Sequence, residues 1–275
     1  MNQISNSSIK LNDGYEIPLL GLGTFLTGGK TCEDSVNFAL RNGYNHIDTA
    51  QGYNNEKQVG NGWKSSGRNR TEIYITTKIS GSNQGYDNTK ASLNNSLKDL
   101  QTDYVDLLLI HWPDIENFSK TIDTWRALVD LQKEGFSRSI GVSNFTEALI
   151  DELLNEIDVL PAVNQVEFHT FLYQKELLAY CRGKTIQLEA YSPIAKAQLF
   201  DHQVLKKMAK KYQKSAAQIM LAWLVNHDLV VIPKSVNEPR IIENSEIFFE
   251  IEEEDMAALN QIEPQTRLVE GDVWA

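Results

Sequence analysis

Four residues that can hold or move a proton stand at or just beyond the ends of apolar runs in this chain. Asp48, Lys78 and His111 each end such a run, and Tyr53 follows the first of them by five residues. Catalytic groups of a parallel α/β barrel gather at the C-terminal ends of its strands, where the loops leave a pocket. We therefore expect these four side chains to converge on one mouth.

The types of these residues indicate reduction of a carbonyl group. A lysine near the floor of such a pocket needs a charged partner, and Asp48 is placed to be one. A close Lys78 ammonium would favour the phenolate of Tyr53 and lower its pKa from the usual value of about 10. Tyr53 would then donate and accept a proton at neutral pH, while His111 would hydrogen-bond the substrate carbonyl.

The missing part of that reaction is a hydride, which side chains cannot supply and a nicotinamide can. Lys234 and Arg240 follow the last apolar run, and Asn237 can cap a helix that has Pro239 in its first turn. Loops after the seventh and eighth strands of barrels often bind phosphate beside a helix N-terminus. We expect both cations to bind a 2′-phosphate, which favours NADPH over NADH.

Predicted strands and helices alternate regularly along the chain, and these elements must position the four residues. Eight short apolar runs predict strands: Leu19 to Gly23, Tyr44 to Asp48, Ile73 to Lys78, Val105 to His111, Ser137 to Gly141, Val163 to Glu167, Thr185 to Ala190 and Leu229 to Ile232. Segments with apolar residues three and four apart predict helices: Ser35 to Arg41, Asn88 to Leu100, Ile122 to Lys133, Glu147 to Glu156, Lys175 to Cys181 and Ala216 to Asn226. The acidic run from Glu250 to Asp255 is typical of the start of a C-terminal helix.

Parallel strands need crossover connections, and near-continuous apolar strands are covered on both faces. The pattern therefore predicts one α/β domain over residues 1–275, a (β/α)8 TIM barrel, with a doubly wound open sheet as the second choice. Two short runs, Ile9 to Leu11 and Glu16 to Pro18, flank an Asp-Gly step and predict an N-terminal β-hairpin. The usual dinucleotide fingerprint is absent, because Leu26 stands where its third glycine should be.

Composition limits the partners. The net charge of −11 disfavours nucleic acid and anionic membranes. Cys32 and Cys181 are too isolated to suggest a disulfide framework or a zinc site, which fits a reducing cytoplasm. No run approaches the roughly 20 apolar residues of a membrane span, and the first ten residues lack a signal-peptide core. We expect a cytoplasmic monomer that acts on a small-molecule carbonyl substrate.

With these residues in place, the chain resembles the aldo-keto reductase superfamily over essentially its whole length. The matching segments are Gly21-Leu22-Gly23-Thr24, His46-Ile47-Asp48-Thr49-Ala50 with Tyr53, Thr77-Lys78, Leu109-Ile110-His111-Trp112-Pro113, Gly141-Val142-Ser143-Asn144-Phe145, Asn164-Gln165-Val166-Glu167, Ala190-Tyr191-Ser192-Pro193, and Ile232-Pro233-Lys234-Ser235 through Arg240 and Asn244. The resemblance implies a barrel that holds NADPH across its mouth, with Tyr53 as the general acid.

The resemblance also implies roles for cofactor-binding residues. Ser143, Asn144 and Gln165 would hydrogen-bond the nicotinamide carboxamide, and Tyr191, which precedes Ser192 in the same set, would stack on the ring. The adenosine 2′-phosphate end would be held by Lys234, Ser235, Arg240 and Asn244. The chain looks most like the prokaryotic branch that contains 2,5-diketogluconate, glyoxal and methylglyoxal reductases, which implies aldehydes or ketones such as small 2-oxoaldehydes or keto-sugars as substrates.

Several points stay open from the sequence. Phe25, Trp112 and Trp274 can supply an apolar substrate wall. The segment from Ile194 to Ala197 lacks the glycines common in this branch, and Lys196 is either a phosphate contact or a solvated lysine.

Two other functions compete with carbonyl reduction. A metal-dependent hydrolase would draw its ligands from His46-x-Asp48, Glu167-x-His169 and His111, but it leaves Lys78 without a role. A catalytically silent NADPH-sensing protein is the other alternative, and the intact set of four residues weighs against it.

Overall fold

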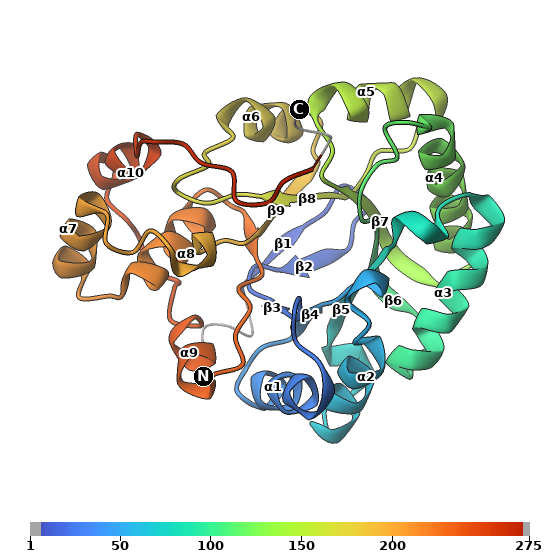
Figure 1. The fold of residues 1–275 in the computed structure, drawn as a ribbon, viewed down its shortest axis with the longest axis horizontal. Helices are drawn as coiled ribbons and strands as arrows, with labels where there is room; N and C mark the ends of the chain where they lie inside the picture. The colour runs from blue at the N-terminus through green and yellow to red at the C-terminus, as the bar shows by residue number, and fades with distance from the viewer. Residues whose placement is uncertain (1–6, 272–275) are drawn as a thin grey trace.

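A computed structural model describes residues 7–271 and has a parallel sheet of eight strands at its centre (Figure 1). The strands neighbour one another in chain order: β3 (Leu22–Gly23), β4 (His46–Asp48), β5 (Tyr74–Ile79), β6 (Val105–Ile110), β7 (Ser137–Ser143), β8 (Val163–Glu167), β9 (Gln187–Tyr191) and β10 (Val230–Val231). Parallel bridges from Leu20 to Val231 and from Gly23 to Lys234 join the first strand to the last. The predicted (β/α)8 barrel is confirmed, and the open sheet is wrong.

An antiparallel hairpin precedes the barrel. Its strands are β1 (Ser8–Lys10) and β2 (Glu16–Pro18), and Ile9 lies opposite Ile17. The side chain of Ile17 is fully buried and packs in one cluster with Leu107 and Val163, which belong to the first half of their strands. The hairpin therefore covers the N-terminal end of the barrel and leaves the opposite end for the site.

Helices form the outer layer around the strands (Figure 1). They are α1 (Gly29–Arg41), α2 (Glu56–Ser65), α3 (Tyr86–Leu100), α4 (Phe118–Lys133), α5 (Glu147–Glu156), α6 (Lys175–Gly183), α7 (Gln203–Tyr212), α8 (Ala216–Asn226), α9 (Glu238–Glu243) and α10 (Glu253–Asn260). Local sequence explains their limits. Ser215 and Gln218 form a capping box at the start of α8, and α10 begins within the acidic run, as expected.

The sequence did not predict helices α2 and α7, which lie between elements that it did predict. The apolar pattern of α2 is interrupted by Gly60 and Gly62, which are poor helix formers. Both glycines are required for packing: a Cβ on Gly62 would lie 2.7 Å from Cβ of Val36 on α1, and one on Gly60 would collide with the Asp99 carbonyl of α3. Tertiary contact outweighs intrinsic propensity here.

Most of the buried apolar surface lies between the strands and the helices, where Trp125 and Trp223 are among the largest buried side chains. The inside of the barrel is more polar. His46, Lys78 and Glu189 are fully buried there, and Gln165 is nearly so. Such groups are tolerated only when they pair with one another, and their pairing defines the site. Within residues 7–271, no helix combines the length and the apolar character needed to cross a bilayer.

Candidate active site

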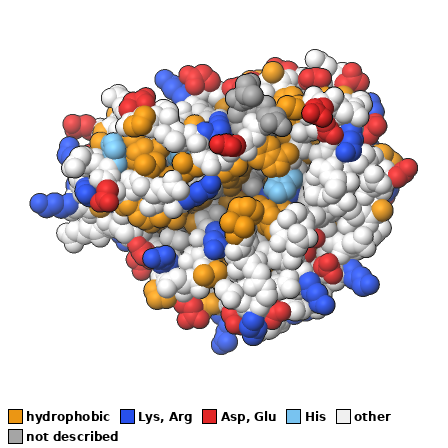
Figure 2. Space-filling model, viewed as in Figure 1, with side chains coloured by type: hydrophobic (Ala, Val, Ile, Leu, Met, Phe, Trp, Pro, Cys, Tyr) orange, Lys and Arg blue, Asp and Glu red, His pale blue; other side chains and the backbone are white. Residues whose placement is uncertain are grey.

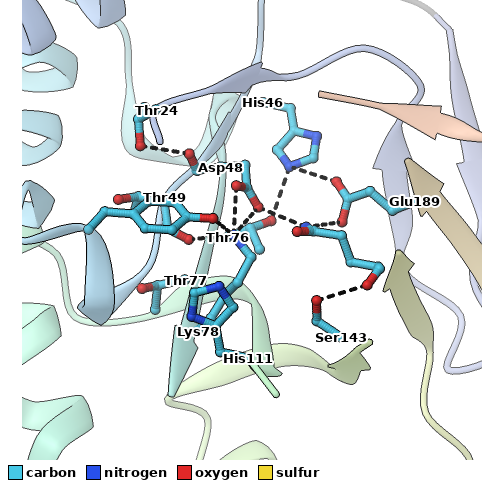
Figure 3. Close-up of polar contacts among 12 residues, drawn as sticks. Thr24, His46, Asp48, Thr49, Thr76, Thr77, Lys78, His111, Ser143 and Glu189 are labelled. Atoms are coloured by element: carbon cyan, nitrogen blue, oxygen red, sulfur yellow. Dashed lines mark hydrogen bonds and ion pairs between the residues drawn. The ribbon is translucent and has the colours of Figure 1, made fainter. Parts of the chain in front are cut away.

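The buried ammonium of Lys78 is the centre of the site (Figure 3). Lys78 lies on β5 and Asp48 ends the neighbouring strand β4, so the parallel pairing places both at the same end of the barrel. The Nζ atom donates to Oδ1 and Oδ2 of Asp48 at 2.7 and 2.8 Å, and to the Thr49 carbonyl at 2.8 Å. The sequence prediction that Asp48 partners Lys78 agrees with this geometry.

Tyr53 comes from the short 3-10 turn η2 (Gln51–Tyr53) that follows β4. The amide of Gln51 anchors this turn by donating to the Ser92 and Ser96 hydroxyls of α3, and its Oε1 accepts from the Ser80 backbone after β5. The turn thus aims the phenol at Lys78, whose Nζ donates to the phenol oxygen at 3.3 Å.

The expected lowering of the Tyr53 pKa is wrong for this state of the protein. Burial is the largest influence and raises the pKa of the phenol. Lys78 acts to lower it but does not offset the burial, and Asp48 raises it further. The sequence could not give the extent of burial, which depends on how the loops pack. Tyr53 therefore carries its proton at neutral pH, as a proton donor must.

The Lys78 ammonium stays charged despite its surroundings. Burial acts to lower its pKa, but Asp48 and Tyr53 raise it, and the net change is upward. A positive charge is thus held 3.3 Å from the Tyr53 oxygen throughout the neutral range.

His111 follows β6 directly and lies beside the phenol. Its ring is edge-on to the Tyr53 ring, with centroids 5.5 Å apart. Burial and, to a smaller extent, the Lys78 charge together lower the pKa of His111 to about 3, so the imidazole is neutral. A neutral imidazole has one N–H donor and one acceptor. The structure therefore brings together all four residues that the sequence singled out.

Asn55 is a site residue that the sequence analysis missed. Its buried amide nitrogen donates to the carbonyls of Thr24 and Thr27, and its oxygen accepts from the Thr49 hydroxyl. These bonds hold the loop that carries Phe25, whose ring centroid lies 5.0 Å from that of Tyr53. Its position as the N-cap residue of α2 could have identified it, but the sequence did not predict that helix.

Glu189 on β9 was also missed, and it changes the expected role of Gln165. The Gln165 Nε2 atom donates to Asp48 at 2.9 Å and to Glu189 at 2.8 Å, inside the barrel. Both of its N–H groups are thus engaged. No hydrogen bond among the described residues uses Oε1 of Gln165, so this oxygen is the atom suited to accept from a carboxamide.

The other residues assigned to the nicotinamide lie together at the ends of β7 and β9. Asn144 accepts a hydrogen bond from the Tyr191 hydroxyl at 2.8 Å and donates to the His111 carbonyl at 2.9 Å. Its backbone φ of 64° is one that asparagine tolerates better than most residues. The Ser143 hydroxyl donates to the Gln165 carbonyl, and Ser192 directly follows Tyr191. Their donor and acceptor types fit a nicotinamide carboxamide.

The residues assigned to the adenosine end lie after β10. Lys234 and Arg240 are exposed, and neither side chain has an ion-pair or hydrogen-bond partner within residues 7–271. Ser235 and Asn244 are largely buried beside them. Two cations without carboxylate partners on a chain of net charge −11 fit an anionic ligand group. The residues present therefore fit both ends of NADPH.

A hollow opens near the centre of the face viewed in Figure 2, bordered by hydrophobic side chains with histidine and cationic groups beside them. Phe25 is 53% exposed at the site, and Trp112 follows His111. Gly271 packs against Trp112, because a Cβ there would lie 2.7 Å from Cη2 of the indole. Trp274, the third expected wall residue, lies outside the described residues.

The C-terminal segment reaches the site through Glu167. This buried carboxylate accepts hydrogen bonds from the backbone N–H groups of Leu268 and Val269 at 2.8 and 3.0 Å, and it lies 3.0 Å from Nε2 of His169. Lys196 donates to the Leu268 carbonyl at 2.8 Å. The chain after α10 is thereby drawn across to the barrel mouth.

The side chains suggested as metal ligands contact other protein groups instead. Glu167 and His169 bond to each other and to the C-terminal segment, while His46 lies 3.0 Å from the Thr76 hydroxyl and 3.7 Å from Glu189 (Figure 3). In the part of the chain that the structure describes, no three His, Cys, Asp or Glu side chains form a group that could hold a metal ion. The positions of these side chains therefore do not support a metal centre of the kind that the hydrolase alternative needs.

Comparison with known proteins places these features. The aldo/keto reductase family model matches residues 19–264. Glyoxal reductase of Bacillus subtilis (strain 168) is 48% identical over 263 residues, which cover 95% of this chain and 94% of that protein. Methylglyoxal reductase DkgA of Yersinia pestis is 41% identical, with 94% of each chain covered. The crystal structure of a Bombyx mori aldo-keto reductase in complex with NADP has a TM-score of 0.89 at 34% identity, covering 97% of this chain and 96% of that one.

Proposed function

Because this chain belongs to the aldo/keto reductase family, we propose that it reduces small 2-oxoaldehydes to hydroxycarbonyl compounds, with Tyr53 as the general acid. It is an NADPH-dependent carbonyl reductase. The relatives named for glyoxal and methylglyoxal are 48% and 41% identical to it over the aligned residues. Phe25 and Trp112 at the site offer mainly ring surface, which suits a small carbonyl compound better than a keto-sugar whose hydroxyls need several polar partners.

One observation carries the proposed chemistry: Lys78 connects the Asp48 carboxylate to the Tyr53 hydroxyl. Tyr53 donates its phenolic proton to the substrate carbonyl oxygen. The Lys78 ammonium stabilises the phenolate that remains, since it lies 3.3 Å from that oxygen. Asp48 keeps Lys78 charged and in place.

His111 orients the substrate. Its neutral imidazole donates one hydrogen bond to the same carbonyl oxygen, which places that oxygen between the imidazole and the phenol. When bound, NADPH supplies the hydride that the carbonyl carbon accepts. The residues that would hold it are Ser143, Asn144, Gln165, Tyr191 and Ser192 at the nicotinamide, and Lys234, Ser235, Arg240 and Asn244 at the adenosine end.

The substrate proposal is tested with the purified enzyme and NADPH. Glyoxal, methylglyoxal, a monofunctional aldehyde and a keto-sugar are compared by the loss of NADPH absorbance. We expect kcat/KM for the two 2-oxoaldehydes to exceed that for the keto-sugar by about tenfold or more, since each unpaired hydroxyl against an apolar wall costs about 1 kcal/mol or more. A keto-sugar with the highest kcat/KM would overturn the proposed substrate class.

A further inference from the structure

A second carboxyl lies inside the barrel beside the Asp48 and Lys78 pair (Figure 3). Glu189 on β9 is fully buried, and its Oε2 accepts from Nε2 of Gln165 at 2.8 Å. The same nitrogen donates to Oδ2 of Asp48 at 2.9 Å. One amide therefore joins two carboxyl groups, and Asp48 is held by Lys78 on one side and by Gln165 on the other.

The charges around Glu189 do not balance if it is ionised. The titratable groups that face it are His46 and Asp48 on β4, Tyr74 and Lys78 on β5, and Tyr53 on the turn after β4. Burial lowers the pKa of His46 to about 3 and raises the pKa of Tyr74 well above its usual value, so both are neutral. Lys78 is the single cation of this group, and Asp48 already binds it.

Glu189 therefore holds a proton at neutral pH. Burial and the neighbouring Asp48 charge outweigh the Gln165 hydrogen bond and Lys78, which act to lower the pKa of this carboxyl, and the net result is a pKa raised to about 8. Its Oε1 atom is buried without a hydrogen-bond partner in residues 7–271. An unpaired oxygen costs less on a neutral acid than on a carboxylate, which agrees with the protonated form.

We propose that Glu189 is a positioning residue for proton transfer: its uncharged carboxyl holds the Gln165 amide against Asp48, and a negative charge on it slows carbonyl reduction. This inference rests on the proposed function of Tyr53. As Tyr53 gives up its proton, negative charge develops on its oxygen. An ionised Glu189 opposes that charge, whereas a neutral Glu189 does not.

The pH dependence follows from the sign of this effect. Below about pH 8 Glu189 is neutral and reduction runs at its full rate. Above that pH the added charge disfavours the phenolate, and kcat/KM for the carbonyl substrate falls. We expect a fall of roughly tenfold between pH 7 and pH 9.5, as for unit charges several ångströms apart at an effective dielectric constant near 20.

The test is the pH profile of kcat/KM for the wild type and for Glu189→Gln, a neutral isostere of the protonated acid. The variant should stay level through pH 8 and decline only where Tyr53 itself titrates. Glu56→Gln is the matched control, because Glu56 is also a buried carboxyl with a raised pKa, but it binds the Thr77 and Ser96 hydroxyls. This control should keep the wild-type fall near pH 8.

If kcat/KM of Glu189→Gln falls near pH 8 as in the wild type, the proposed role of Glu189 is wrong. A wild-type kcat/KM that stays level through pH 9 would overturn it as well. If Glu189→Gln does not fold, the wild type labelled with carboxyl-¹³C glutamate gives the answer by NMR. The inference requires one glutamate carboxyl that titrates near pH 8, in parallel with kcat/KM. A spectrum in which no glutamate titrates above pH 7 would overturn it. Failure of the proposed function differs from both results, since it appears as no turnover of any carbonyl compound at any pH.

Discussion

Nζ of Lys78 lies 2.7 Å from Oδ1 of Asp48, and both side chains are buried inside the barrel, with exposures of 0% and 2%. Their strands are paired in parallel, which places both residues at the same end of the barrel. A buried pair of this kind is sensitive to the loss of one partner, because the other is left as an uncompensated charge.

Lys78→Met should therefore damage both folding and turnover. We expect the free energy of unfolding to fall by about 3–5 kcal/mol, the range for breaking a buried ion pair from one side. The value of kcat should fall about 100-fold or more, because the phenolate of Tyr53 loses its stabilising charge. Urea unfolding and NADPH oxidation measure the two effects.

The control for that variant is Lys90→Met. Lys90 lies 2.6 Å from Glu134, but this pair is on the surface, with exposures of 30% and 43%. Its loss should cost less than about 1 kcal/mol and leave kcat unchanged. Equal destabilisation by the two substitutions would contradict the picture of a buried, uncompensated Asp48.

Lys234→Ala should weaken NADPH far more than NADH. Lys234 has no carboxylate partner within the described residues, so its charge is available to the 2′-phosphate that only NADPH carries. A charged hydrogen bond is worth about 1.5–3 kcal/mol, which predicts a rise of roughly 10- to 100-fold in Kd for NADPH. Quenching of protein fluorescence measures both affinities. Lys57→Ala, on the exposed side of α2, serves as the control. Equal weakening of NADPH and NADH binding in the Lys234 variant would refute the assignment of Lys234 to the 2′-phosphate.

Gly271→Ala should change the carbonyl substrate range and spare the cofactor. The added Cβ would lie 2.7 Å from Cη2 of Trp112, so the indole or the C-terminal segment must shift. We expect KM for the carbonyl substrate to change about threefold or more, while Kd for NADPH stays within about twofold. Gly183→Ala is the control, since a Cβ there meets nothing within 4 Å. An unchanged KM in the Gly271 variant would show that Trp112 does not line the substrate pocket.

The acid side of the pH profile should be flat. Burial, with Lys78, lowers the pKa of His111 to about 3, so the ring stays neutral as the pH falls from 7 to 5. Protonation, which would turn both nitrogens into donors and add a second cation beside Lys78, begins only well below this range. Values of kcat/KM for the carbonyl substrate at constant ionic strength measure this. A fall with a midpoint near pH 6.5 that disappears in His111→Gln would contradict a buried, neutral imidazole.

Much of this arrangement was predictable because the strands are nearly continuous apolar runs. A polar residue such as Lys78 or His111 near the end of such a run must lie toward the C-terminal end of a parallel sheet, and all four expected residues do meet at that end. The rule needs only the order of residues along each strand, so it requires no knowledge of long-range packing.

The parts that were missed depend on contacts between distant segments. From the sequence alone, Gly60 in α2 predicts a break in the helix, and only its close packing against α3 explains why a glycine is needed there. Glu189, between Leu188 and Ala190, looks like the outward-facing residue of a strand, and only the closure of the barrel shows that it faces Asp48. The Tyr53 pKa depends on burial, which sequence spacing does not report.

Tyr53→Phe tests most directly whether Tyr53 donates the proton, because it removes one oxygen and keeps the ring. We predict that kcat for reduction of methylglyoxal falls about 10²- to 10⁴-fold, the usual contribution of a positioned general acid, while Kd for NADPH stays within about twofold. A Tyr53→Phe enzyme that binds NADPH normally and reduces methylglyoxal at a near wild-type rate would contradict the account.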